Sequence, residues 1–124
     1  MGWEVTPEAL TEFLRRIHDE YWKGPVYITE NGAAYSDAPG PDGAIHDSRR
    51  IDYIRKHLAA LEAAIDQGVP VEGYFYWSLM DNIEWLAGFA QRFGLVHVDS
   101  ETLVRTPRSS FDWYRDVIAR NGLN

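Results

Sequence analysis

Two acidic residues lie close to the ends of short apolar runs, and bulky aromatic residues accompany them. Glu30 directly follows the run "VYIT", while Trp77 lies near the end of the run 73–78, with Glu84 and Trp85 a few residues further on. In parallel α/β folds, side chains at the carboxyl ends of strands meet on one rim. Carboxylates bind sugar hydroxyls and attack anomeric carbons, and indole faces cover the apolar side of a pyranose. This combination predicts a saccharide site.

Each of these residues also has a purely structural interpretation. Glu30 alone is compatible with a helix N-cap or a solvent-facing acid, and Trp77 is by base rate more often a core residue. Asp81 begins an Asp-Asn pair, which favours turns, so we prefer a turn for it. Glu84 and Trp85 have no obvious structural need in a loop. Residue types alone would pair Glu30 with Glu84 as nucleophile and acid.

Signals for other kinds of chemistry do not occur in the sequence. The four histidines lack metal-ligand spacing, so we expect no metal site, and we expect no cofactor. The Gly40–Gly43 segment "GPDG" lacks the lysine and the helix start of a phosphate-binding loop. No Gly-x-Ser-x-Gly nucleophile motif is present either.

Composition narrows the possible partners. The 124 residues carry a net charge of −7, which argues against nucleic acid because its phosphates demand a basic surface. The chain has no cysteine, so neither disulfides nor thiolate metal sites are possible. No apolar run approaches about 18 residues and no signal-peptide pattern begins the chain, so we expect no membrane partner and a cytoplasmic location.

Hydrophobic spacing predicts three helices and two strands. A helix is expected to begin at Thr6-Pro7, with an N-cap hydroxyl followed by proline at the first helical position. A second helix is expected from Asp47 or Ser48 to Gly68, and a third from Thr106-Pro107 to Asn121-Gly122. The continuous apolar runs at 26–29 and 73–78 predict strands that are covered on both faces, as in parallel sheets.

The remaining segments are expected to be loops, and the order of elements indicates a parallel architecture. The segment 32–46 is rich in proline and glycine, and the long segment 79–105 contains a short apolar run at 94–98. Helix, strand, helix, strand, loop and helix follow the logic of βαβ units. Two parallel strands leave exposed edges and cannot close a sheet. The sequence therefore predicts a slice of a larger α/β fold.

Three stretches resemble the C-terminal part of glycoside hydrolase family 1: "YITENGAAY", "DYIRKHLAALEAAIDQGVPVEGYFYWSLMDNIEWLAGFAQRFGLVHVD" and "RTPRSSFDWYRDVI". The stretch "GWEVTPEAL" matches too, so the resemblance covers essentially the whole chain. Family members are (β/α)8 barrels that hydrolyse β-glycosides with retention. The resemblance implies that residues 1–124 are the C-terminal quarter to third of a TIM barrel: helix 6, strand 7, helix 7, strand 8 and helix 8. The complete barrel would require residues outside this chain.

The resemblance also implies a role for each site residue. Glu30, in the "TENG" motif, would be the nucleophile that forms a glycosyl-enzyme ester. Trp77 would stack under the sugar ring, Glu84 would accept hydrogen bonds from O4 and O6, and Trp85 would donate its indole N–H to O3. Phe93 would help to close the pocket wall. A carboxylate at O6 would repel a 6-phosphate, which disfavours phosphorylated sugars.

One catalytic group is missing. In the family the general acid/base is a different Glu, in an "NEP" motif, and this chain contains no such motif. We therefore expect a β-glucosidase-like segment that hydrolyses terminal β-glucosides when the N-terminal barrel part completes it, and that is inactive alone. The alternatives are an inert sugar-binding module and a scaffold fragment. Alone, the exposed strand edges are expected to cause self-association or pairing with a complementary chain.

Overall fold

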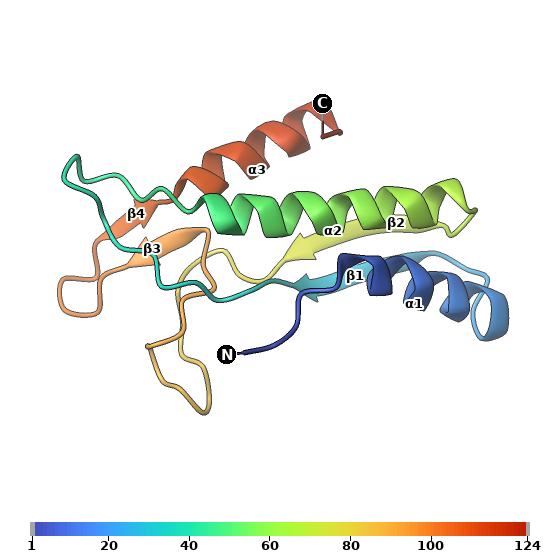
Figure 1. Ribbon diagram of the computed structural model, residues 1–124, viewed down its shortest axis with the longest axis horizontal. Coiled ribbons are helices and arrows are strands. Elements are labelled where there is room, and N and C mark those ends of the chain that lie inside the picture. The colour runs from blue at the N-terminus through green and yellow to red at the C-terminus, as the bar shows by residue number, and fades with distance from the viewer. Residues whose placement is uncertain (1, 124) are drawn as a thin grey trace.

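The computed structural model describes residues 2–123 as an elongated layer of strands covered by helices (Figure 1). Within these residues the elements are α1 (Pro7–Glu20), β1 (Val26–Asn31), α2 (Ser48–Asp66), β2 (Val71–Tyr76), β3 (Val96–Val98), β4 (Arg105–Pro107) and α3 (Ser109–Arg120). β1 and β2 pair in parallel, while β3 and β4 form a separate antiparallel pair. The predicted parallel βαβ unit is therefore present.

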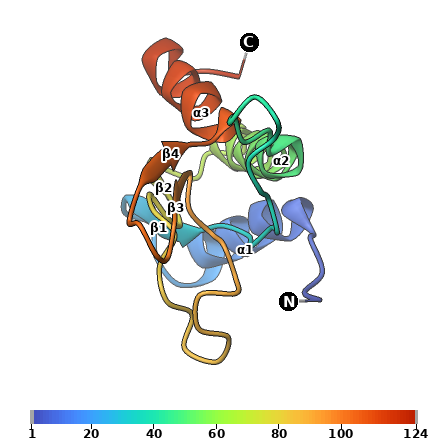
Figure 2. The same cartoon turned by 90° about the vertical axis from the view of Figure 1, so that its left-hand side faces the viewer.

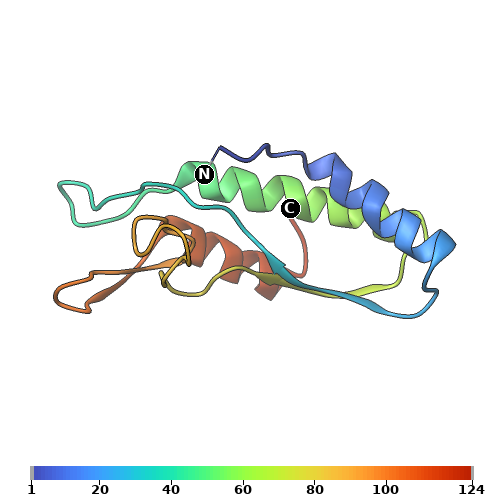
Figure 3. The ribbon, with the colours of Figure 1, turned by 90° about the horizontal axis from the view of Figure 1, so that it is seen from below.

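The core lies between the helices and one face of the parallel pair. The first buried cluster joins α1 and α2 above the early part of the strands, with Leu14 and Leu61 at its centre and Val26 and Ile28 packed against it. A second cluster around Ile54 lies toward the strand ends and includes residues of α3. α2 lies between α1 and α3 (Figure 3). The buried residues of α1 and α2 face these clusters because burial removes apolar surface from water, whereas other apolar residues of the three helices stay exposed.

The other face of the parallel pair is uncovered within the described residues. Tyr27 is 53% exposed and Phe75 is 59% exposed, although both lie within strands. The expectation that these strands are covered on both faces is therefore wrong for this chain. In a closed barrel the side chains of the other strands fill that space. Within residues 2–123, this face of β1 and β2 therefore presents apolar side chains to solvent.

The start of the third helix differs from the sequence-based expectation. Thr106 and Pro107 belong to β4, where they pair with His97 and Val96, and α3 begins only at Ser109. Pairing with a distant strand has overridden the local cap-and-proline signal. The short apolar run at 94–98, expected within a loop, contains β3 for the same reason.

The expected element list is also incomplete. The order helix 6, strand 7, helix 7, strand 8 and helix 8 contains two strands, whereas the described part of the chain has four, in two separate sheets. These sheets form an open layer and close no barrel. No helix between residues 2 and 123 is long and apolar enough to cross a membrane.

Candidate functional site

The carboxyl ends of β1 and β2 lie side by side. Asn31 is opposite Tyr76, and the next residue, Trp77, donates its backbone N–H to the carbonyl of Asn31 over 3.0 Å. The loops that follow both strands extend from the same end of the molecule (Figure 1). The structure therefore brings Glu30 and Trp77 to neighbouring strand ends, as a rim site in a parallel fold requires.

Glu30 is exposed because the register of β1 changes just before the strand ends. Thr29 and Glu30 are both exposed, and the pairing with β2 is irregular between Ile28 and Asn31. Such bulges re-aim side chains and are common next to active sites. Asn31 instead turns back to the sheet and accepts a hydrogen bond of 2.7 Å from the Tyr74 hydroxyl. The Glu30 carboxylate has no hydrogen bond to any other described residue.

Gly32 allows the two strand ends to approach each other. A Cβ at this position would overlap the carbonyl oxygen of Trp77, so any side chain would push the backbone of Trp77 away. Trp77 is 40% exposed, which leaves part of the residue accessible. The order Glu-Asn-Gly thus places an accessible acid and an accessible indole on adjacent chains.

Phe93, in the segment between β2 and β3, lies next to these strand ends. It is buried, and its carbonyl accepts hydrogen bonds from the Tyr76 hydroxyl at 3.0 Å and from Arg50 Nη1 at 3.1 Å. The backbone next to it pairs with Ser78, because Leu95 donates its N–H to the Ser78 carbonyl over 2.9 Å. Phe93 also lines a cavity of about 300 Å³ that touches Gly32.

Glu84 and Trp85 lie in a loop that projects from the body of the molecule, coloured gold in Figures 1 and 2. Two backbone hydrogen bonds between Glu84 and Gly88, of 2.6 and 2.7 Å, close a tight turn. Trp85 at its tip is 95% exposed. The structure therefore brings the strand-end segments of Glu30, Trp77 and Phe93 together, whereas Glu84 and Trp85 lie in the projecting loop.

Asp81 fastens the base of this loop, and its role is not the turn that the sequence suggests. Its carboxylate accepts hydrogen bonds from the buried Arg108 at 2.8 and 3.1 Å and from the backbone N–H of Gly94 at 2.9 Å. Burial raises the pKa of Asp81, but the hydrogen bonds and charge of Arg108 outweigh it and hold that pKa below its usual value. Asp81 is therefore a structural carboxylate in an ion pair.

A second buried network surrounds Arg50, which the sequence did not single out as a functional residue. Arg50 is fully buried and pairs with Asp47 and Asp37. One feature of the sequence could have indicated this network: Arg50 lies four residues before Ile54, on the apolar face of α2, where a charge needs buried partners. Asp47 or Ser48 was expected to cap α2, but the Asp47 side chain makes no cap hydrogen bond there and accepts one of 2.8 Å from the backbone N–H of Ser110, in the first turn of α3.

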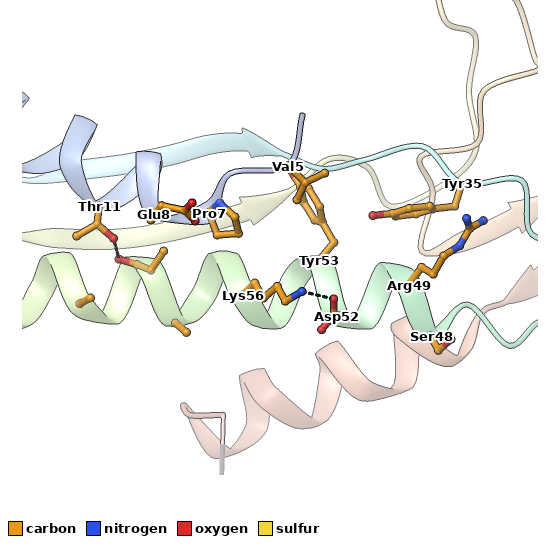
Figure 4. Close-up of a pocket in the computed structure, with 13 residues that line it drawn as sticks. Val5, Pro7, Glu8, Thr11, Tyr35, Ser48, Arg49, Asp52, Tyr53 and Lys56 are labelled. Atoms are coloured by element: carbon orange, nitrogen blue, oxygen red, sulfur yellow. Dashed lines mark hydrogen bonds and ion pairs between the residues drawn. The ribbon is translucent and has the colours of Figure 1, made fainter. Parts of the chain in front are cut away.

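A separate groove lies elsewhere. It has a volume of about 1040 Å³ and runs along α2 beside the start of α1 (Figure 4). In it the Thr11 hydroxyl donates to the carbonyl of Ala60 over 2.7 Å, and Lys56 pairs with Asp52. None of the five predicted site residues lines this groove. Among the described residues, no group of three or more potential ligand side chains could hold a metal ion.

An exposed carboxylate and an indole on neighbouring parallel strand ends define a site of the kind found in (β/α)8-barrel hydrolases. The model of Glycosyl hydrolase family 1 matches residues 1–123, and the chain belongs to this family.

Known relatives agree with this assignment. The chain is 48% identical over 123 residues to β-glucosidase A of Thermotoga maritima. The aligned region covers 99% of this chain and 28% of the relative. It is 51% identical to a bifunctional β-D-glucosidase/β-D-fucosidase of Bifidobacterium breve, over 96% of this chain and 27% of the relative. The solved structure of the Thermotoga maritima family 1 β-glucosidase superposes with a TM-score of 0.98 over the whole chain.

These matches correct the expected position of the chain in the barrel. The chain spans about 28% of the length of the relatives, and the family match runs over its residues 1–123. This supports a fragment of a TIM barrel. It does not support the predicted assignment to the C-terminal quarter to third, from helix 6 to helix 8.

Proposed function

We propose that the chain is a segment of a retaining β-glycosidase and that Glu30 is its catalytic nucleophile. The observation that carries this proposal is the exposed Glu30 carboxylate at the end of β1, beside the accessible indole of Trp77. A carboxylate oxygen of Glu30 attacks the anomeric carbon while the bond to the leaving oxygen breaks. Water then hydrolyses the resulting ester and regenerates the carboxylate.

The aromatic and acidic residues around Glu30 bind the sugar in this proposal. Trp77 stacks on the pyranose, and Phe93 forms part of the wall. Glu84 accepts hydrogen bonds from O4 and O6, and Trp85 donates to O3, once the projecting loop packs against the completed barrel. The Thermotoga maritima relative has been solved with glucoimidazole and with galacto-hydroximolactam, which supports a β-glycoside as the substrate class; a terminal β-glucoside is the substrate proposed for this chain.

Residues outside this chain complete the site. The uncovered face of β1 and β2 and their open edges need further strands, and the chain lacks the "NEP" motif that carries the family's acid/base Glu. Without an acid that protonates the leaving oxygen, roughly 10²–10⁴-fold in rate is lost from that contribution alone. The isolated chain is therefore inactive. The alternative is an inert fragment that binds sugar through Trp77 without turnover.

A chimeric barrel tests the nucleophile. Residues 1–123 replace the matched segment of the Thermotoga maritima β-glucosidase A, and hydrolysis of an aryl β-glucoside is measured. We expect activity, and we expect a 2-fluoro-glucoside inactivator to label Glu30, as located by peptide mass mapping. A chimera with Glu30→Gln is the matched control and should take up no label. A label on any other residue, with turnover intact, would refute the assignment.

The isolated chain separates the two functional hypotheses. We expect no hydrolysis of aryl β-glucosides by the purified chain, so robust turnover by it would contradict the need for a completed barrel. Titration with glucose, followed by Trp fluorescence, tests the sugar-binding alternative. Saturation in the millimolar range that disappears in Trp77→Ala would favour the inert binding fragment.

A further inference from the structure

Arg50, in the first turn of α2, contacts the backbone of two segments that carry the proposed site. Its Nη1 donates to the carbonyl of Ala33 at 2.7 Å and to that of Phe93 at 3.1 Å, and its Nη2 donates to the carbonyl of Arg92 at 3.1 Å. Nη1 also lies 3.0 Å from the Tyr76 hydroxyl, to which it donates. One buried guanidinium thus joins the end of β2 and the segments at 33 and 92–93.

Two carboxylates hold the guanidinium itself in place. Asp47 accepts from Nε and Asp37 accepts from Nη2, each at 2.8 Å. Asp47 is in turn bound by the backbone N–H and the hydroxyl of Ser110. Arg50 is 0% exposed, so these contacts act without competition from water. The cation is therefore fixed relative to both α2 and α3.

The contacts of Arg50 fall next to the residues that the proposed function uses. Ala33 lies three residues after Glu30, Tyr76 immediately precedes Trp77, and the third contact is the carbonyl of Phe93 itself. The guanidinium is planar and presents its donors in fixed directions, whereas an ammonium is a flexible point charge. A lysine at this position would keep the charge but would lose the geometry that joins these segments.

We propose that Arg50 is the positioning residue of the glycosidase site, holding the strand-end segments of Glu30, Trp77 and Phe93 in their relative places. This inference rests on the proposed function for the roles of those three residues. Arg50 acts through the backbone and the Tyr76 hydroxyl and touches no substrate. Reactions on bound substrates are sensitive to such positioning, because a displacement of about 1 Å costs on the order of 10²-fold in rate.

The test compares Arg50→Lys with Leu61→Ala in the chimeric barrel. Leu61 lies in the core cluster between α1 and α2, away from the strand ends, and its truncation lowers stability without touching the site. Active sites are counted with the 2-fluoro-glucoside, and kcat and KM are measured per labelled site. We expect Arg50→Lys to lower kcat/KM by roughly 10²-fold per site, and Leu61→Ala to leave it unchanged. Equal values for Arg50→Lys and wild type would overturn the proposal.

Amide hydrogen exchange supplies a readout that does not depend on activity. We expect the amides of residues 30–35, 76–79 and 92–95 to exchange faster in Arg50→Lys than in Leu61→Ala, when the two variants are compared under conditions in which their melting temperatures are equal. Tyr76→Phe, which keeps Arg50 and removes one of its acceptors, should show the same pattern more weakly. This variant takes the place of Arg50→Lys in the experiment if Arg50→Lys does not fold. A uniform change over the whole segment would overturn the positioning role. An inactive wild-type chimera with this local pattern would refute the proposed function alone.

Discussion

At the scale of single residues, the site depends on the order Glu30-Asn31-Gly32. The bulge exposes the carboxylate of Glu30, Asn31 turns inward to the Tyr74 hydroxyl, and Gly32 lets the backbone of Trp77 approach. Each of the three residues has a different physical task. A change at any of them should therefore have its own measurable signature.

Replacing Glu30, the proposed nucleophile, should remove turnover but allow partial chemical rescue. In the chimeric barrel, Glu30→Gly is expected to lower kcat by on the order of 10⁴-fold, because no carboxylate remains to attack the anomeric carbon. A small anion such as formate, which fits the space left by the side chain, should restore part of the rate. Glu84→Gly is the comparison, and formate should not restore a chemical step there. Full activity of Glu30→Gly without formate would rule out the nucleophile role.

Adding a single methyl group at Gly32 should disturb the neighbouring strand end. The new Cβ of Gly32→Ala would overlap the Trp77 carbonyl, so we expect a loss of roughly 1–3 kcal/mol in the free energy of unfolding. Gly122→Ala is the matched control, since a Cβ there meets only an ordinary contact. Denaturant unfolding of both variants measures the difference. Equal stability would show that the Trp77 backbone moves aside easily.

At the scale of elements, α2 carries more of the architecture than its apolar stripe suggests. Its first turn holds Arg50, its middle contributes Ile54 to the core, and His57 stacks on Tyr53 with ring centroids 4.0 Å apart. Polar and charged residues on this face are buried with their partners. The helix therefore connects the two core clusters with the strand-end loops.

Burial of His57 should make stability depend on pH. Burial lowers the pKa of His57 below its ordinary value of about 6.5, so the unfolded chain binds the proton more readily. The stabilisation that comes from burying neutral His57 is fully present above pH 6.5 or so and is lost as pH falls through the lowered pKa of the folded state. The melting temperature should fall less between about pH 7.5 and pH 5 in His57→Phe than in the wild type. The exposed His46→Gln should not show this difference, and an identical loss in all three proteins would contradict the prediction.

The Asp81–Arg108 pair should make the stability of the protein depend on pH in the acidic range, below the range in which His57 acts. Because the pKa of Asp81 is lowered when the chain is folded, its stabilisation is present above the unfolded value of about 3.9 and is lost as pH falls below it. We expect Asp81→Asn to destabilise the protein at pH 7 and to reduce its sensitivity to acid below pH 4 or so. Asp66→Asn, at the exposed end of α2, is the control. Acid unfolding followed by circular dichroism distinguishes them.

At the scale of the whole molecule, the uncovered face of β1 and β2 sets the behaviour of the isolated chain. Tyr27 and Phe75 are exposed there, and both strands have open edges within the described residues. Such surfaces pair with further strands or with other copies of the chain. We expect concentration-dependent association in sedimentation velocity, which Phe75→Lys reduces. Phe13→Lys, at an exposed position on α1, should not reduce it, and a monomer at all concentrations would refute the prediction.

Much of the local structure was predictable from the sequence, because it depends on spacing within one element. The periodic apolar residues and the Thr6-Pro7 signal located α1, and the apolar runs located β1 and β2. The strand-end positions of Glu30 and Trp77 followed from that order, since parallel strands end on one rim. The motifs around them indicated the family, which the comparisons confirm.

The remaining features depend on contacts between residues far apart in the sequence, and only the tertiary structure decided them. Thr106 and Pro107 read locally as a helix start, yet pairing with β3 makes them a strand. Asp47 caps the neighbouring helix, and Asp81 pairs with Arg108, 27 positions away. A helical period shows which face is buried but not what it is buried against. For the same reason, the role of Arg50 became visible only when the segments of Ala33, Tyr76 and Phe93 met around it.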